Sequence, residues 1–330
     1  MIVAVGPDLH IRSQGPGGRL EEDFTAFQLG LLRAMCSMAQ AKGAQALLLP
    51  GDVIDRYRLP ADGQNEALTG LMDVIRSSGM AWFTTLGQHD VMGHSSGTYK
   101  THSNLRLVEE GVNGQLTVVH SGQRVVFGDL DIYGFGYGDH ALSLFMQGKV
   151  KPQNPDRINV ALLHASVFEE PFMDFMTIDQ VPANGFDLQV HGDIHPGFRP
   201  RILPPECLAV NMGVMTWQKR NETADCVPGC IGLVNLTADS TELLEVLQAP
   251  HPSAAECFSL SADEQVAASY DHIDDASIAS AVQAMHQMRA QRGKIDEPEL
   301  LKGLAEASGN QTAYTTAMRF YSAAQQAAEK

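Results

Sequence analysis

The stretch LPGDVID, residues 49–55, is the most informative segment of the sequence. The apolar run at 46–49 predicts a buried strand, and Gly51-Asp52 places a carboxylate just past its carboxyl end. In an open α/β sheet, ligands bind at that edge. The stretch therefore predicts an α/β core with a polar site at one edge of its sheet.

The same pattern of an apolar run followed by polar residues recurs along the chain. Helices are expected between the runs, at 21–41 and 65–77, because apolar residues there follow helical spacing. Residues 115–137 have hairpin character, so we expect mixed rather than purely parallel sheets. The expected strands are 2–5, 46–49, 82–86, 125–133, 160–163, 188–191 and 208–211.

Carboxylates and imidazoles gather at the ends of these predicted strands. Hard carboxylate oxygens mixed with imidazole nitrogens suit Mn²⁺, Fe²⁺ or Zn²⁺, and a set of this size with one shared carboxylate is what two adjacent ions require. Two such ions activate water and stabilise an in-line phosphoryl displacement. The residues concerned are Asp8 and His10, Asp52, Gln88-His89-Asp90, His164, and Asp193 with His195.

In this order and spacing, the sequence resembles the calcineurin-like metallophosphoesterases. Their blocks run Asp-x-His, Gly-Asp, Gly-Asn-His-Asp/Glu, His and Gly-His-x-His, and this chain matches five blocks between residue 2 and about residue 215. The resemblance implies a four-layer α/β/β/α sandwich with mixed sheets. It also implies two metal sites that share Asp52: Asp8, His10 and His195 complete the first, and Gln88, His164 and Asp193 complete the second. His89, paired with Asp90, would be the general acid, and Asp55 a support behind the ligands.

Two positions depart from that pattern. Gln88 stands where asparagine is usual, and Asp193 where the first histidine of the last block is usual. Both offer oxygen, so the second site is expected to favour Mn²⁺ or Mg²⁺ over zinc. The departures put the affinity for the second ion in doubt, and Gln88 positioning substrate or water is the alternative to ligation.

Within the superfamily, the sequence is similar to the repair-nuclease branch, especially phage-encoded SbcD-type subunits. Residues 8–12 through Arg19, residues 49–52, the blocks at 87–90 and 192–195, and residues 211–213 carry this similarity. It implies a manganese-dependent DNA exonuclease or endonuclease that works with an SMC-like coiled-coil ATPase in DNA repair or recombination. In that family the helical segment after the catalytic domain docks on the ATPase.

Domain organisation follows a change in composition near residue 250. We expect a catalytic domain at 1–250 and a helical segment at 251–330, which would dock the ATPase; a homodimer is also allowed for. Within the segment, amphipathic stripes such as Tyr314, Met318 and Tyr321 also fit packing on their own domain.

Four residues near the metal-bearing loops are candidates for contacting substrate phosphate: Arg12, Arg19, Arg56 and His94. For the arginines, an exposed side chain without a special role is an equal alternative. His94, like His102, is better explained as a solvated loop residue.

Composition limits the remaining alternatives. A formal net charge of −16 argues against a chain that holds DNA through a broad basic face. Five cysteines at irregular spacing indicate a reducing compartment, and Cys226 with Cys230 is more plausibly two free thiols than half a zinc site. We expect no membrane span and a cytoplasmic location, in the host cytoplasm if the protein is phage-encoded.

Two other functions remain open from the sequence alone. One is a phosphodiesterase of small molecules or cyclic nucleotides, or a protein phosphatase, which would use the same metal site. The other is a scaffold subunit whose site is weakened at Gln88 and Asp193.

Overall fold

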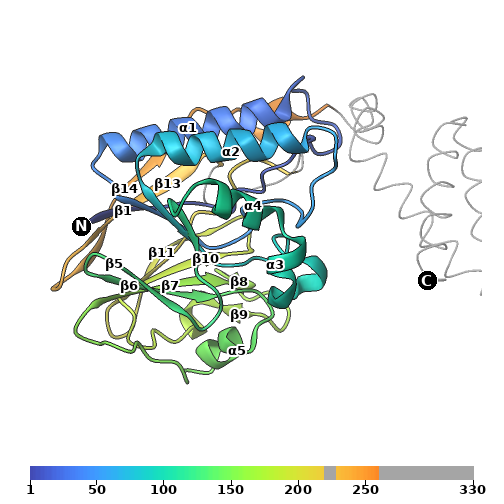
Figure 1. The fold of residues 1–330 in the computed structure, drawn as a ribbon. Coiled ribbons are helices and arrows are strands. Elements are labelled where there is room, and N and C mark those ends of the chain that lie inside the picture. The colour runs from blue at the N-terminus through green and yellow to red at the C-terminus, as the bar shows by residue number, and fades with distance from the viewer. Residues whose placement is uncertain (219–227, 260–330) are drawn as a thin grey trace, which may run out of the picture. The chain divides into compact units, whose positions relative to one another are not determined.

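Two six-stranded sheets dominate the computed structural model, which describes residues 1–218 and 228–259 (Figure 1). The first sheet runs in the order β14 (Thr241–Gln248), β13 (Cys230–Leu236), β1 (Ile2–Val5), β2 (Ala46–Leu49), β3 (Ala81–Thr84), β4 (Leu116–Val118). The second runs β11 (Phe198–Leu203), β12 (Cys207–Asn211), β10 (Leu188–Gly192), β7 (Ile158–His164), β6 (Leu130–Phe135), β5 (Arg124–Phe127). In the first sheet β1 to β4 are parallel, whereas β13 pairs antiparallel with both β1 and β14. In the second sheet the four central strands are parallel and the edge strands β11 and β5 are antiparallel to their neighbours, so the expected mixed sheets are confirmed.

Each sheet is buried on both faces, which explains why its central strands read as continuous apolar runs. Along β2, Ala46 and Leu48 join the core between the two sheets, while Leu47 and Leu49 join the core beneath the helices. Successive side chains of a strand point to opposite faces, so one short strand supports two layers.

Helices cover the outer faces. α1 (Phe24–Ala41) and α2 (Gln64–Ser78) lie side by side over the first sheet (Figure 1). α1 begins at Phe24, because the side chain of Asp23 accepts a hydrogen bond from the Ala26 amide at 2.8 Å and caps the helix. α5 (His140–Met146) packs Leu142 and Phe145 on the outer face of the second sheet. The α/β/β/α class is confirmed.

The structure corrects the predicted strand at 125–133. This segment forms a hairpin of β5 and β6, which turns at Gly128 with a φ of 55°. β13 and β14 were not expected, yet β13 pairs antiparallel with β1 and extends the first sheet. The shorter elements are α3 (Tyr99–His102), α4 (Asn104–Gly111), α6 (Ala254–Cys257), β8 (Val167–Phe168), β9 (Met176–Thr177), η1 (Met92–His94), η2 (Ser96–Thr98) and η3 (Ile178–Gln180).

Some expectations fall outside the described residues. These are the helical stripes beyond residue 260 and the thiol of Cys226; Cys230 itself is free and buried. Past residue 250, Ala254, Cys257 and Phe258 pack against Trp217, and a division of the chain at 250 stays a prediction. Over the described ranges, no helix has the length and apolar character needed to cross a membrane.

Candidate metal centre

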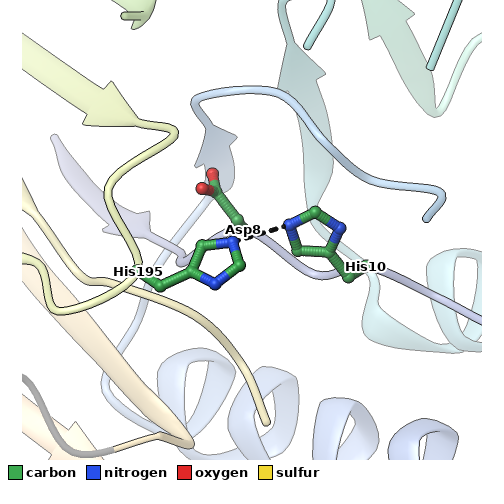
Figure 2. Close-up of side chains that lie close together, drawn as sticks. All are labelled: Asp8, His10 and His195. Atoms are coloured by element: carbon green, nitrogen blue, oxygen red, sulfur yellow. Dashed lines mark hydrogen bonds between the residues drawn. The ribbon is translucent and has the colours of Figure 1, made fainter. Parts of the chain in front are cut away.

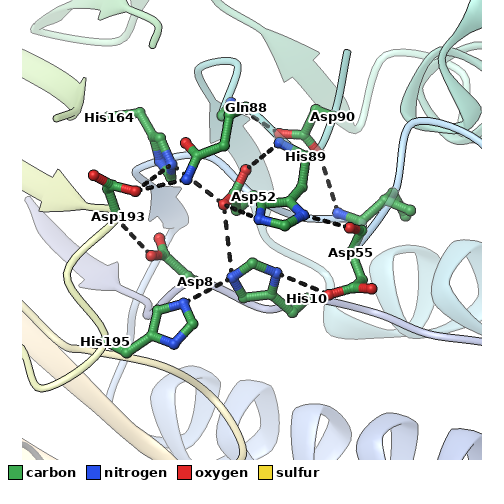
Figure 3. Close-up of polar contacts among 12 residues, drawn as sticks. Asp8, His10, Asp52, Asp55, Gln88, His89, Asp90, His164, Asp193 and His195 are labelled. Atoms are coloured by element: carbon green, nitrogen blue, oxygen red, sulfur yellow. Dashed lines mark hydrogen bonds and ion pairs between the residues drawn. The ribbon is translucent and has the colours of Figure 1, made fainter. Parts of the chain in front are cut away.

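All seven expected metal ligands gather where strand ends of the two sheets meet (Figure 3). Asp8, Asp52 and Gln88 follow β1, β2 and β3 of the first sheet. From the second sheet, His164 ends β7 and Asp193 follows β10. The site thus lies at the seam of the sandwich, where neither sheet alone would provide a complete ligand set.

One half of the centre consists of Asp8, His10 and His195 (Figure 2). The Nε2 atoms of His10 and His195 lie 3.1 Å apart, and one ligand atom from each of the three residues fits within 4.8 Å of the others. Metal–nitrogen bonds of about 2.1 Å place neighbouring ligand atoms roughly 3 to 3.5 Å apart. This spacing therefore suits a single ion held by one carboxylate and two imidazoles.

Asp52 lies at the middle of the centre. Its Oδ2 is 3.6 Å from His10 Nε2 and 3.3 Å from His164 Nε2, while its Oδ1 accepts a hydrogen bond from the His89 amide at 2.9 Å. Burial by itself would raise the pKa of the Asp52 carboxyl, but His164 and the other nearby imidazoles hold it well below its usual range. Asp52 is thus a carboxylate whose charge and position would allow it to bridge two ions.

The other half contains Gln88, His164 and Asp193. Gln88 Nε2 donates to Asp193 Oδ1 at 2.6 Å, and His164 Nε2 lies 4.0 Å from the same oxygen. His164 Nδ1 donates to the Pro50 carbonyl at 3.0 Å, which leaves the lone pair of Nε2 facing the centre. The structure brings the two departing residues, Gln88 and Asp193, into direct contact.

Four buried atoms of the centre test whether these residues fit metal ions. Asp8 Oδ1, Asp52 Oδ2, Gln88 Oε1 and His164 Nε2 are shielded from solvent and make no hydrogen bond. Buried polar atoms without partners are rare in proteins, and an ion is one of the explanations for them. Three oxygens and a nitrogen are ligands that Mn²⁺, Fe²⁺ or Zn²⁺ accept. The residues therefore fit two divalent ions, and they leave the identity of the metal open.

Electrostatics favour positive charge in the same place. Burial raises the pKa of Asp8 to about 7. Burial would lower the pKa of His164, but the carboxylates of Asp52, Asp8 and Asp193 raise it to about 10. The buried carboxylates therefore attract a cation, and a divalent ion would replace the proton because ligation requires a neutral imidazole.

Strained backbone and close packing position these ligands. His10 and Asp52 each have a φ of 45°, and Asp193 has a φ of 80°, in the left-handed region that non-glycine residues rarely adopt. A Cβ on Gly87 would lie 1.9 Å from Asp52 Oδ1, and one on Gly192 would lie 2.5 Å from Asp8 Oδ1. The two glycines of the motifs thus make room for carboxylates that approach the backbone.

Asp55 supports the centre through both its side chain and its backbone. Its Oδ1 lies 3.4 Å from His10 Nδ1 and accepts from Arg12 at 2.6 Å, while its carbonyl oxygen lies 2.6 Å from His89 Nδ1. The expectation that Asp55 acts behind the ligands agrees with these contacts.

The expected pairing of His89 with Asp90 is wrong. Asp90 is fully buried, where its carboxylate accepts from the amides of Ile54 at 3.0 Å and Gly87 at 3.0 Å and so joins two ligand-bearing loops. Burial raises the pKa of Asp90 to about 8. The His89 side chain is 42% exposed, and its Nε2 lies 3.9 Å from Asp52 Oδ2. His89 also forms a compact group with His10 and Asp52, so it borders the reaction space directly.

The four candidates for substrate contact fare differently. The structure does not favour a substrate contact for Arg19: its side chain is 2% exposed, donates to Glu21 at 2.6 and 2.8 Å, and lies 4.7 Å from the ring centroid of Phe24. Arg12 is largely engaged, because it donates to Asp55 and to Gln218.

Arg56 has a side chain that is 67% exposed, and His94 is exposed with its ring 5.8 Å from that of Tyr137. For these two, the substrate role stays a prediction.

Sequence reasoning missed Ser166, whose hydroxyl donates a short hydrogen bond to Asp193 Oδ2. It lies two residues after His164, and that proximity was the available signal. A hydroxyl carries no distinctive motif, so its role becomes visible only when β7 and β10 are placed side by side.

Comparisons with known proteins add little to this geometry. No protein-family model matches the chain, and no curated protein matches it. Among solved structures, a dimetal phosphatase from Danio rerio has a TM-score of 0.45 and 10% sequence identity, and the match covers 75% of this chain and 98% of that one. Another crystal structure has a TM-score of 0.39 and 13% identity, and its match covers 73% of this chain and 97% of that one. At these levels, neither likeness assigns an activity to this chain.

Proposed function

We propose that this chain is a phosphoesterase that uses two divalent metal ions and cleaves phosphodiester bonds of DNA. The observation that carries the metal-dependent part is the convergence of four buried ligand atoms that make no hydrogen bond, on Asp8, Asp52, Gln88 and His164. DNA as substrate, and manganese as metal, rest on the sequence similarity to the repair-nuclease branch. When bound, the two ions supply a nucleophile from water and stabilise charge on the phosphoryl oxygens.

The chain's own residues supply orientation and a proton. Asp55 fixes His10 through its carboxylate and His89 through its carbonyl oxygen. His89 Nε2 is turned toward Asp52 at the exposed side of the centre, where a leaving oxygen would receive its proton. Burial of Asp8 and Asp52 excludes bulk water from the side where the ligands lie.

An SMC-like coiled-coil ATPase that binds residues 251–330, and a homodimer, belong to the same proposal. They rest on sequence pattern and on the family resemblance. A partner would also explain how an acidic chain with a net charge of −16 engages DNA.

A second candidate is a scaffold subunit with a weakened site. The hydrogen bond of 2.6 Å between Gln88 and Asp193 favours it, because these two side chains satisfy one another in part. Under this candidate, the chain would bind fewer than two ions and hydrolyse no phosphoester.

The test is hydrolysis of bis-p-nitrophenyl phosphate, p-nitrophenyl phosphate, and linear double-stranded and single-stranded DNA, each with Mn²⁺, Mg²⁺ or EDTA. We expect manganese-dependent cleavage of the diesters, and a loss of about 100-fold to 10,000-fold in kcat for His89→Ala. His140→Ala is the matched control, because His140 is an exposed histidine at the start of α5. Hydrolysis of the monoester alone would replace the nuclease with a phosphatase, and no hydrolysis with any metal would favour the scaffold.

A further inference from the structure

A cavity of 480 Å³ opens beside two of the loops that carry the metal centre. Tyr57 and Arg58 in its wall follow Asp55 in sequence, and Met92 follows His89 by three residues. Consecutive Cα atoms are 3.8 Å apart, so the Cα atoms of Met92 and His89 are at most about 11 Å apart. The cavity therefore lies close enough to share a substrate with the centre.

The cavity is basic although the chain is acidic. Arg58, Lys100, His102 and Arg106 line it, and no aspartate or glutamate among the described residues does. Arg106 is already engaged with Glu110 at 2.7 Å. The side chains of Arg58 and Lys100 are exposed and form no hydrogen bond or ion pair within the described part of the chain. In a chain of net charge −16, this local excess of free cations favours an anionic ligand.

Asn104 gives a second, independent indication of a ligand. It lines the cavity, is only 5% exposed, and uses its Oδ1 to accept from Gln64 Nε2 at 3.3 Å. Its Nδ2 is a buried donor without a hydrogen-bond partner. The backbone amide of Asn104 donates to the Tyr57 carbonyl at 2.7 Å, which fixes the residue at the first turn of α4. A buried donor at the positive end of a helix is suited to a phosphate oxygen.

We propose that this cavity is a phosphate-binding subsite for a nucleic-acid strand whose scissile phosphate lies at the metal centre. Arg58, Lys100 and the Nδ2 of Asn104 hold a phosphate a few nucleotides away, since a strand rises about 3.4 Å per nucleotide. The inference rests on the proposed function and deepens it. A substrate that presents two phosphates at this separation is a polynucleotide, whereas a small phosphomonoester presents one.

The test compares Arg58→Gln/Lys100→Gln with Arg33→Gln/Lys151→Gln. Both double variants remove two exposed positive charges, and the second removes them from the middle of α1 and from the loop before β7. Binding of a fluorescein-labelled single-stranded 12-mer in EDTA is followed by anisotropy over a range of salt. For the first variant we expect Kd to rise about tenfold or more. The slope of the logarithm of the association constant against the logarithm of salt concentration should fall in magnitude by about 1.4, because each lost phosphate contact of a single strand removes about 0.7.

Hydrolysis of bis-p-nitrophenyl phosphate with Mn²⁺ separates this inference from the proposed function, because the small diester carries one phosphate and has no second one for the cavity. We expect its kcat/KM to stay within about twofold of wild type in both double variants. Equal binding by the two double variants, or an equal loss of diester hydrolysis and oligonucleotide binding in Arg58→Gln/Lys100→Gln, would overturn the subsite. Wild type that binds the 12-mer through these residues but hydrolyses no phosphoester would overturn the proposed function alone.

Asn104→Asp is the second variant, because it replaces the buried donor by an acceptor of the same shape. We expect weaker binding of the 12-mer. We also expect inorganic phosphate to compete less well with the 12-mer. Thermal unfolding of each variant verifies that the fold is intact. Unchanged competition by inorganic phosphate in a folded Asn104→Asp variant would contradict the role of this residue.

Discussion

The two halves of the metal centre differ in how their ligands are held. In the first half, the Asp55 carboxylate holds Nδ1 of His10, and Oδ2 of Asp8 accepts a hydrogen bond from the Asp193 amide at 2.8 Å. The remaining ligand atoms of His10 and Asp8 therefore face a shared space. In the second half, Gln88 and Asp193 are bonded to each other. In the first half an ion replaces the contact of 3.1 Å between His10 Nε2 and His195 Nε2 and can bind both nitrogens. In the second half an ion must break the hydrogen bond between Gln88 and Asp193, whose donor Nε2 is an amide nitrogen and not a metal ligand. We therefore expect unequal affinities for the two ions.

The largest effect is expected where the halves meet. Asp52→Asn removes the bridging negative charge, and we expect phosphodiester hydrolysis to fall by about 1,000-fold or more. The measurement is kcat/KM with bis-p-nitrophenyl phosphate at saturating Mn²⁺, with the exposed Asp62→Asn as control. Activity within tenfold of wild type would show that the halves act separately and that Asp52 does not bridge.

A smaller effect is expected from the support of the first half. Asp55→Asn weakens the hold on His10 and keeps the backbone carbonyl that holds His89. We expect the tighter Mn²⁺ affinity to fall by about tenfold to 100-fold while the weaker affinity is unchanged. Calorimetric titration of the variant with Mn²⁺ measures both affinities. An equal loss of affinity at the two sites would contradict the division into halves.

In the second half, Asp193→Ala should affect the weaker ion alone. The backbone amide that binds Asp8 remains, so the first half keeps its geometry. We expect about a tenfold loss in the weaker affinity, with the exposed Asp179→Ala as control. If the variant loses the tighter ion instead, the assignment of Asp193 to the second half is wrong.

The first half was largely predictable from the sequence, and the second only in part. Asp8, His10 and Asp52 follow short apolar strands, and the carboxyl ends of parallel strands meet at one edge, so their convergence follows from periodicity and spacing. The hydrogen bond between Gln88 and Asp193 joins residues 105 positions apart on different sheets, and no local pattern encodes it. The role of Asp90 was mistaken for a similar reason, because its backbone partners become known only once the loops are placed.

Arg19 limits how far the centre extends. Sequence proximity to the metal-bearing loop suggested a substrate contact, but the guanidinium packs against Phe24 and Phe258 and pairs with Glu21. Arg19 thus contributes to the packing of the fold. Its burial could not be inferred from its position in the sequence.

The smallest effect on catalysis is therefore expected at this position. Arg19→Met keeps much of the side-chain volume, so we expect kcat/KM to change less than about twofold while the free energy of unfolding falls by about 2 kcal/mol. Urea unfolding and diester hydrolysis of the same preparation measure the two quantities. A large rise in KM with unchanged stability would restore Arg19 to the substrate site.

Calorimetric titration of the metal-free wild-type chain with Mn²⁺ counts the ions that the centre binds. We expect two equivalents with distinct affinities, of which Asp52→Asn weakens both and Asp193→Ala only the weaker. Binding of one equivalent or none, or two equivalents that survive Asp52→Asn unchanged, would contradict a two-metal centre bridged by Asp52.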